Sequence, residues 1–255
     1  MQTNNIKNIC TDQTKFPILS PRLAKIAHMI PNSSTFADIG TDHGYLPVYL
    51  CNTGKAQHAI ACDIKQAPLN RAKDTISTYN ATKAVETRLG GGLSPIEIDE
   101  ADAVVIAGMG GLLIADILNE GLNKLGKVKT LILQPMSAVP ELRLFLALNN
   151  WTTMSEAVVV EGEKIYNIFS VLPPADTDKD TENIADTDIC NPDFFIGKYL
   201  MENKPENFDV YIQKRYQKIE KMILGLQNSD SEESRQKLNT CLKLKKEITE
   251  IMQKS

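Results

Sequence analysis

The segment Ala37–Leu46 contains the residues whose types and spacing are best suited to ligand chemistry. It reads Ala-Asp-Ile-Gly-Thr-Asp-His-Gly-Tyr-Leu and runs from an apolar, β-rich stretch into a helical pattern. A glycine turn at such a place lets backbone approach a ligand, and the N-terminus of the following helix presents free N–H groups. A dinucleotide fits poorly, because the G-x-G-x-x-G fingerprint needs glycine where Asp42 and Tyr45 stand, and a pyrophosphate would meet the Asp42 carboxylate.

The spacing of one acid and two glycines in this segment favours a different ligand. Asp38 lies two residues before Gly40, and Gly44 follows four residues later. This pattern resembles the loop of S-adenosylmethionine-dependent methyltransferases, whose ligand ends in an amino acid instead of a phosphate. The resemblance implies that Asp38 lies near the ammonium group of the ligand and that Gly40 leaves room for it. For the glycines alone, an ordinary strand–turn–helix is the alternative.

Further strand ends carry residues that suit the same ligand. Asp63 ends the next β-rich stretch, where its carboxylate can accept both hydroxyls of a ribose. Glycine clusters follow at residues 90–92 and 108–111. Several glycines on one edge of a sheet are hard to explain by folding alone, because each costs chain entropy. The predicted cofactor residues are Asp38, Gly40, Thr41, His43, Gly44, Tyr45, Leu46, Asp63, Ile64, Gly90, Gly91, Gly92, Ala107, Gly108 and Met109.

The elements that must position these residues alternate between short β-rich runs and helical patterns up to about Val171. This alternation is typical of a parallel sheet covered by helices. Two later β-rich runs, split by Glu161-Gly162-Glu163-Lys164, predict a closing hairpin. We therefore expect an α/β fold with a Rossmann-like, doubly wound sheet of seven strands. The strands are predicted at Thr35–Ile39, Ala59–Asp63, Glu86–Leu89, Ala103–Ala107, Thr130–Gln134, Trp151–Val160 and Tyr166–Pro173.

A helix is predicted ahead of the sheet and a helical domain behind it. Ser20 as N-cap and Pro21 in the first turn predict a helix that Pro31 ends. Residues 174–193 are acidic and poor in large apolar groups, which predicts an exposed linker between a domain of residues 1–173 and one of residues 194–255. In the second domain, apolar residues at heptad-like spacing predict an antiparallel, coiled-coil-like hairpin after a short helix, Phe194–Met201. They are Ile212, Tyr216, Ile219, Ile223 and Leu226, and then Leu238, Leu242, Ile248 and Met252.

Charge is distributed unevenly along the chain. The formal net charge of −4 gives no sign of a protein coated in positive charge. However, residues 176–193 alone carry −6, whereas residues 194–255 hold twelve Lys and Arg against nine Asp and Glu. The net negative charge of the chain therefore comes from the predicted linker, whereas the helical domain is mildly basic.

Cysteine usage and the first residues bear on the compartment. The five cysteines are scattered and never form a C-x-x-C pair, so they suggest neither a disulfide framework nor a zinc site. The polar start, Met1–Pro17, lacks the apolar core of a signal peptide. We expect a cytoplasmic, monomeric protein without a bound metal or a membrane anchor.

The motifs taken together resemble one family. They are Leu19-Ser20-Pro21-Arg22-Leu23, Ala37–Pro47, Arg88–Leu93, Ala107-Gly108-Met109-Gly110-Gly111 and Leu131–Pro135. They are similar to those of the bacterial tRNA adenine-N1 methyltransferases that modify adenine 22, over roughly residues 18–172 and more loosely the helical tail. The resemblance implies S-adenosylmethionine as cofactor and tRNA as partner. Members usually carry an acid where Gly91 stands, which would bond the adenine amino group of the cofactor.

The implied reaction needs few catalytic groups. Adenine N1 is an uncharged nucleophile, so methyl transfer to it needs in-line positioning more than a strong base. The product is cationic, and a nearby carboxylate would stabilise the developing charge. Asp42 is the catalytic candidate, with capping of the next helix as its alternative role. His43 and Tyr45 could also stack on the target base or pack against the sheet.

The target adenine must leave its base pair, because N1 lies on the Watson–Crick edge. A second surface of the protein must therefore hold the folded RNA. Clustered basic residues suit phosphate contacts, although a solvated coiled-coil face is the alternative interpretation. The predicted RNA-binding residues are Arg22, Lys214, Arg215, Lys218 and Lys221. Two other functions remain open: methylation of a small molecule, and cofactor binding without catalysis in a protein-interaction module.

Overall fold

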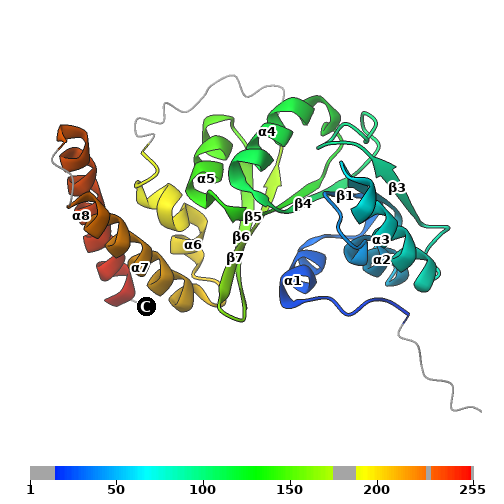
Figure 1. Cartoon of the computed structure of the whole chain (residues 1–255), viewed down its shortest axis with the longest axis horizontal. Coiled ribbons are helices and arrows are strands. Elements are labelled where there is room, and N and C mark those ends of the chain that lie inside the picture. The colour runs from blue at the N-terminus through cyan, green and yellow to red at the C-terminus, as the bar shows by residue number, and fades with distance from the viewer. Residues whose placement is uncertain (1–14, 175–187, 228–230, 254–255) are drawn as a thin grey trace, which may run out of the picture.

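A single seven-stranded sheet organises the computed structural model, which describes residues 15–174, 188–227 and 231–253 (Figure 1). The strand order is β3-β2-β1-β4-β5-β7-β6. Strands β1 to β5 run parallel, and β7 is antiparallel to both β5 and β6. The predicted Rossmann-like, seven-stranded sheet is therefore confirmed. The strands are β1 (Ser33–Ile39), β2 (Ala56–Asp63), β3 (Val85–Leu89), β4 (Ala103–Gly110), β5 (Thr130–Ser137), β6 (Thr152–Glu161) and β7 (Lys164–Leu172).

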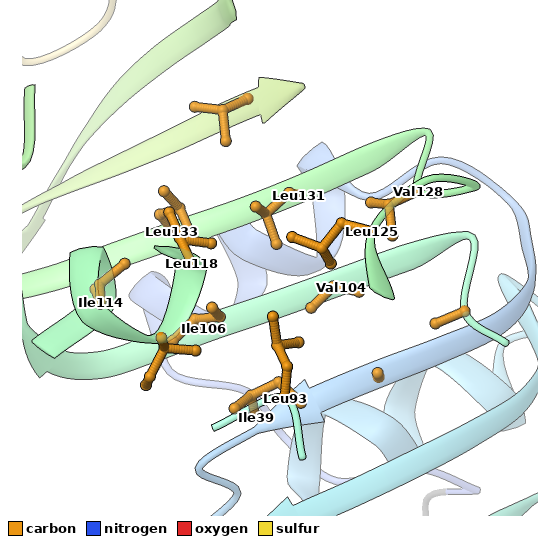
Figure 2. Packing of buried hydrophobic residues seen from close by; sticks show 14 of the residues in the cluster. Ile39, Leu93, Val104, Ile106, Ile114, Leu118, Leu125, Val128, Leu131 and Leu133 are labelled. Atoms are coloured by element: carbon orange, nitrogen blue, oxygen red, sulfur yellow. The ribbon is translucent and has the colours of Figure 1, made fainter. Parts of the chain in front are cut away.

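Helices cover both faces of the sheet, and each face has its own core. The helices α1 (Pro21–Met29), α2 (Tyr45–Asn52) and α3 (Gln66–Thr78) bury apolar side chains against one face. The helices α4 (Gly111–Gly121) and α5 (Val139–Leu148) cover the other. Figure 2 shows side chains of this second core between α4 and strands β4 and β5. Its labelled members include Ile106, Ile114, Leu118 and Leu133, all fully buried.

The first helix begins and ends as its sequence predicts. Ser20 Oγ accepts a hydrogen bond from the N–H of Leu23, and Pro21 occupies the first turn. The helix is capped by Ile30, directly before Pro31. This fixed start places Arg22, in the first turn, beside the carboxyl edge of the sheet, where its main-chain N–H donates to Glu161 Oε2 at 3.1 Å.

The helical tail is an antiparallel hairpin, as predicted. It comprises a π-helical turn (Asp193–Gly197), α6 (Lys198–Asn203), α7 (Phe208–Leu226) and α8 (Glu232–Gln253), with α7 and α8 side by side (Figure 1). Ile212, Ile219 and Ile223 of the predicted seam are buried. On α8 the buried residues are Cys241, Leu244 and Ile248, whereas Leu242 is 46% exposed, so its assignment to the apolar face is wrong. Of the other three residues predicted on this face, Ile248 is buried, and Leu238 and Met252 are partly buried against the same core.

The tail packs directly on the sheet domain. Arg143 of α5 pairs with Glu156 of β6 at 2.5 Å and donates to the Phe194 carbonyl at 2.7 Å, and both charged side chains are buried. Val158 of β6 shares a core with the tail helices. Most of the predicted linker, residues 175–187, lies outside the described residues. Cys190, also inside the predicted linker, is buried with its Sγ 3.9 Å from that of Cys241, so the folded tail starts before residue 194.

Candidate functional site

A cavity of about 590 Å³ lies at the carboxyl ends of β1, β4 and β5, a size typical of sites for small ligands. Parallel α/β sheets bind their ligands at this edge. Ten of the predicted cofactor and catalytic residues line the cavity: Asp38, Gly40, Thr41, Asp42, His43, Gly44, Tyr45, Leu46, Ala107 and Gly108. The other lining residues are Ile18, Ser20, Arg22, Leu23, Met136 and Glu161.

The glycine turn after β1 forms the floor of this cavity. Gly40 has φ +81°, and a Cβ at this position would lie 2.2 Å from Cε of Met109. The N–H groups of Gly40 and Thr41 both donate to the Cys62 carbonyl at 2.8 Å, which fixes the turn to the end of β2. Only glycine satisfies both the left-handed conformation and the close approach of Met109. The turn therefore keeps the backbone open to a ligand.

Asp38 is a buried acid at the cavity wall, 8% exposed. Burial raises the pKa of its carboxyl from 3.8 to about 6, against the positive charge of Arg22, which lowers it. The neighbouring Thr41 side chain is buried beside this carboxylate, and its hydrogen bond also lowers the pKa of Asp38. A buried acid in this cavity favours a polar, cationic ligand group there.

Arg22, which is predicted to bind RNA, is half-buried at this cavity, apart from the tail that carries the other predicted RNA-binding residues. Its Nη1 donates to the fully buried Gln134 Oε1 at 2.5 Å, and its guanidinium lies 5.4 Å from the centre of the Tyr166 ring. It lines the same cavity as Asp38. The capped first turn of α1 determines this placement, and no sequence pattern indicates the partner on β5.

Asp42 is exposed at the cavity but already has partners. Its Oδ1 forms an ion pair with Arg71 of α3, and its Oδ2 lies 3.4 Å from Nε2 of His43. The His43 ring in turn stacks on Tyr45, with centroids 5.2 Å apart and ring planes 12° apart. The two rings therefore pack on each other at the cavity, and sequence reasoning missed Arg71.

Five more predicted cofactor residues, Asp63, Ile64 and Gly90–Gly92, lie at the ends of β2 and β3, whereas Met109 is on β4 next to Gly40. Asp63 Oδ1 accepts from the Lys65 N–H at 2.7 Å, and its main-chain carbonyl accepts from Gly90 N at 3.0 Å. A Cβ on Gly91 would lie 3.2 Å from Cδ1 of Ile64, so these residues are neighbours. None of them lines the cavity around Asp38, but they continue along the same sheet edge from β1 to β3.

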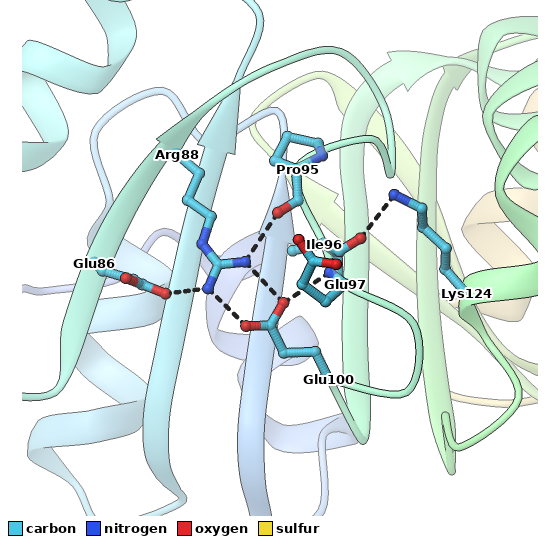
Figure 3. Close-up of polar contacts among 7 residues, drawn as sticks. All are labelled: Glu86, Arg88, Pro95, Ile96, Glu97, Glu100 and Lys124. Carbon is cyan, nitrogen blue, oxygen red and sulfur yellow. Dashed lines mark hydrogen bonds and ion pairs between the residues drawn. The ribbon is translucent and has the colours of Figure 1, made fainter.

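Two basic side chains hold the loop that follows β3 (Figure 3). Lys124 Nζ donates to the carbonyls of Leu93, Ser94 and Ile96 at 2.7–3.1 Å. Arg88 pairs with Glu86 and Glu100 and donates to the Pro95 carbonyl at 2.9 Å. These contacts make the Gly90–Gly92 backbone part of a fixed loop. No sequence pattern indicates the role of Lys124.

The predicted tail cluster splits in two. Lys214, Lys218 and Lys221 are exposed and share one face of α7, because they are spaced by four and three residues. Arg215 is 8% exposed, with its guanidinium 3.8 Å from the centre of the Phe195 ring. Its prediction as a surface phosphate contact is therefore wrong, since the helix turns it toward the tail core.

A second cavity of about 650 Å³ lies between α5, the start of β6 and the tail, away from the predicted residues. Within the described residues, no group of three or more His, Cys, Asp or Glu side chains could hold a metal ion. No helix of the described part of the chain has the length and apolarity to cross a membrane.

Comparisons with known proteins agree with this geometry. Residues 19–169 match the sequence model of a family described as a methyltransferase domain. The tRNA (adenine(22)-N(1))-methyltransferase of Bacillus subtilis is 34% identical over 221 residues, which cover 86% of this chain and 91% of that protein.

Solved structures give the same result in three dimensions. The B. subtilis m1A22 tRNA methyltransferase TrmK superposes with a TM-score of 0.77 at 31% identity, covering 92% of this chain and 99% of that one. Sp1610 of Streptococcus pneumoniae, solved in complex with S-adenosyl-L-methionine, gives a TM-score of 0.75 at 28% identity, covering 92% of this chain and 100% of that one. On this sequence and structural evidence, the chain belongs to the tRNA (adenine(22)-N(1))-methyltransferase family.

Proposed function

We propose that this chain transfers a methyl group from S-adenosylmethionine to N1 of adenine 22 in tRNA, with the residue roles given below. The observation that carries the assignment is the cavity in which a buried acid, Asp38, and a cation, Arg22, face one ligand site at the carboxyl edge of a methyltransferase sheet.

The residues of the cavity fit the amino-acid end of the cofactor. That end is a zwitterion, and the cavity offers the Asp38 carboxylate for an ammonium group and the Arg22 guanidinium for a carboxylate. Thr41 Oγ1, buried beside Asp38, adds a hydrogen-bonding group. When bound, S-adenosylmethionine supplies an electrophilic methyl group on a sulfonium.

The ends of β2 and β3 fit the nucleoside end. Asp63 retains acceptor capacity beyond its bond to Lys65 N, which suits a pair of ribose hydroxyls. Ile64 and Gly91 lie together next to it, as a ring-binding slot requires. Because Gly91 has no acidic side chain, contacts to the adenine amino group come from the fixed backbone of this loop.

Asp42 is the group that we place near the methylated base. Its side chain is 65% exposed at the cavity, so it can approach a cationic adenine, and a carboxylate there lowers the energy of the developing charge. Its ion pair with Arg71 holds the carboxylate in place. The remaining contribution of the chain is to align N1 with the methyl group.

The tail holds the tRNA in this proposal. The face formed by Lys214, Lys218 and Lys221 presents three positive charges at the spacing of one helix stripe, which suits phosphates. We further propose that the enzyme acts as a monomer in the cytoplasm, without a metal.

The decisive experiment is transfer of a labelled methyl group from the cofactor to unmodified tRNA transcripts. Product on a transcript with adenine 22, and none on one with guanine 22, supports the proposal. Cofactor binding without product on any tRNA would favour a non-catalytic protein, and product only on small molecules would favour the other alternative. For the tail, the double variant Lys214→Glu with Lys218→Glu should weaken tRNA binding, and Glu206→Gln serves as control. Deletion of the tail is uninformative, because it would remove the Phe194 carbonyl that Arg143 contacts and expose the buried Arg143–Glu156 pair.

A further inference from the structure

The cavity extends beyond the path of the proposed cofactor. Asp63 and Gly91 lie on β2 and β3, on one side of β1, whereas Met136 and Glu161 line the cavity from β5 and the β6–β7 hairpin, on the other side. A ligand that runs from Asp38 toward Gly91 therefore leaves the β4–β5 side of the cavity open. A second ligand group has room there.

The walls of the cavity include exposed apolar side chains. Ile18 is 87% exposed, Met136 48% and Tyr45 39%, and all three line this one cavity. Large apolar side chains that are exposed around a single cavity mark a binding surface for an apolar or aromatic face.

Tyr45 is held in place before any ligand binds. The His43 ring stacks on it at 5.2 Å, and Asp42, itself paired with Arg71, lies 3.4 Å from His43 Nε2. Gly44 between the two rings has φ +66°, and a Cβ there would lie 3.1 Å from the Cβ of Ala72. The turn that brings the rings together is therefore fixed by α3 packing as well as by the ion pair.

We propose that the stacked Tyr45 and His43 rings receive the flat face of an unpaired purine of the RNA, the base to be methylated, and that Asp42 and Arg71 position His43. This inference rests on the proposed function and reassigns both rings from the cofactor to the base. Aromatic side chains bind unpaired nucleobases by stacking on their flat faces. A base that reacts at its Watson–Crick edge must first leave its base pair, which exposes such a face. Ile18 and Met136 line the open side on which such a base enters.

The test compares Tyr45→Ala, Tyr45→Phe and a control, Leu112→Ala, since Leu112 is 60% exposed at the start of α4 but does not line the cavity. Calorimetry gives the cofactor Kd, and steady-state kinetics give kcat and the KM for tRNA. Tyr45→Ala should lower kcat/KM for tRNA by about 5- to 100-fold, the loss expected for one aromatic–base stack. Its cofactor Kd should not change, Tyr45→Phe should retain most of the activity that Tyr45→Ala loses, and Leu112→Ala should behave as wild type.

A second readout reports stacking directly. A tRNA with 2-aminopurine in place of adenine 22 should fluoresce less when bound to wild type or Tyr45→Phe than when bound to Tyr45→Ala. A weakened cofactor Kd in Tyr45→Ala with unchanged tRNA kinetics, or equal fluorescence in all variants, would overturn the inference and return the rings to the cofactor. Absence of methyl transfer by the wild-type chain would instead contradict the proposed function.

Discussion

Arg22 Nη1 donates a 2.5 Å hydrogen bond to Oε1 of Gln134, a side chain that is fully buried at the end of β5. This contact joins the first helix to the sheet and places a residue that is predicted to bind RNA in the same cavity as Asp38. Gln134 Nε2 is itself bonded to the Pro135 carbonyl at 2.8 Å, so the acceptor is held in one orientation.

We expect Arg22→Met to weaken cofactor binding by about 1.5–3 kcal/mol, the range for hydrogen bonds to charged groups. The KM for tRNA at saturating cofactor should stay unchanged. Calorimetry and steady-state kinetics check both, with Lys25→Met on the same helix as control. An unchanged cofactor Kd with a raised, salt-sensitive KM for tRNA would restore the original RNA assignment.

Cofactor binding should depend on pH through Asp38. Its pKa in the free protein is about 6, so the carboxylate that receives an ammonium group is lost as pH falls below 6. The cofactor Kd should rise by up to about tenfold per pH unit below 6 and be constant above about 7. Calorimetry between pH 5 and 8 measures this, and Asp38→Asn should bind weakly with no such dependence. A wild-type Kd that is constant across this range would contradict the assignment.

The raised pKa of Asp38 also affects the folding stability of the cofactor-free protein. Cofactor binding should improve as pH rises through 6, whereas this stability should decrease. The folded pKa exceeds the ordinary 3.8, so the folded chain holds the proton more tightly than the unfolded chain. Stability of the free protein should therefore fall as pH rises from about 4 to about 6. In thermal denaturation at pH 7 without cofactor, Asp38→Asn should be more stable than wild type.

Asp63→Ala should weaken cofactor binding by about 1–3 kcal/mol, because it removes a charged hydrogen-bonding partner of the ribose. Asp63→Asn should lose less, since it keeps an acceptor for both Lys65 N and one hydroxyl. Asp74→Ala, exposed on α3, serves as control. A Kd for Asp63→Ala equal to that of wild type would refute the ribose assignment.

Gly91→Asp should tighten cofactor binding by about tenfold or more, because it supplies an acidic partner for the adenine amino group. The substitution is tolerable: the backbone of Gly91 is not left-handed, and its nearest neighbour is the end of the flexible Ile64 side chain at 3.2 Å. Gly92→Asp is the matched control. With φ +52° and Ile117 at 3.3 Å, it should lose stability without gaining affinity. Weaker binding by Gly91→Asp would place the adenine elsewhere.

The buried Arg143–Glu156 pair should couple the tail to the sheet. Arg143→Met leaves Glu156 buried and unpaired, which should cost about 3–5 kcal/mol in urea denaturation. The double variant with Glu156→Gln should cost clearly less than the sum of the two single variants. Glu202→Gln, exposed on α6, should have little effect. Additive losses would show that the two side chains do not interact.

Patterns among neighbouring residues were enough to predict much of the fold. The spacing of apolar residues predicted all seven strands, and Ser20 with Pro21 predicted the start of α1. Gly40 and Gly44 predicted the turn at the cavity, because the conformation of a turn depends on the residues within it. In the tail, the spacing of apolar residues was not enough to predict which side chains are buried. Leu242 and Arg215 lie beside the buried stripes of their helices, and packing against Phe195 and Cys190 decided which side chains turn inward.

The sequence by itself determined the sheet, the ligand edge and the residues of the cofactor loop, since strand period and glycine turns are properties of short segments. Only the tertiary structure decided which distant side chains share a site. Arg22 meets Gln134, Asp42 meets Arg71 and Lys124 meets the loop after β3 across 112, 29 and up to 31 residues of chain. Such pairings follow from how helices dock on the sheet, which depends on the packing of the whole core and leaves no local mark in the sequence.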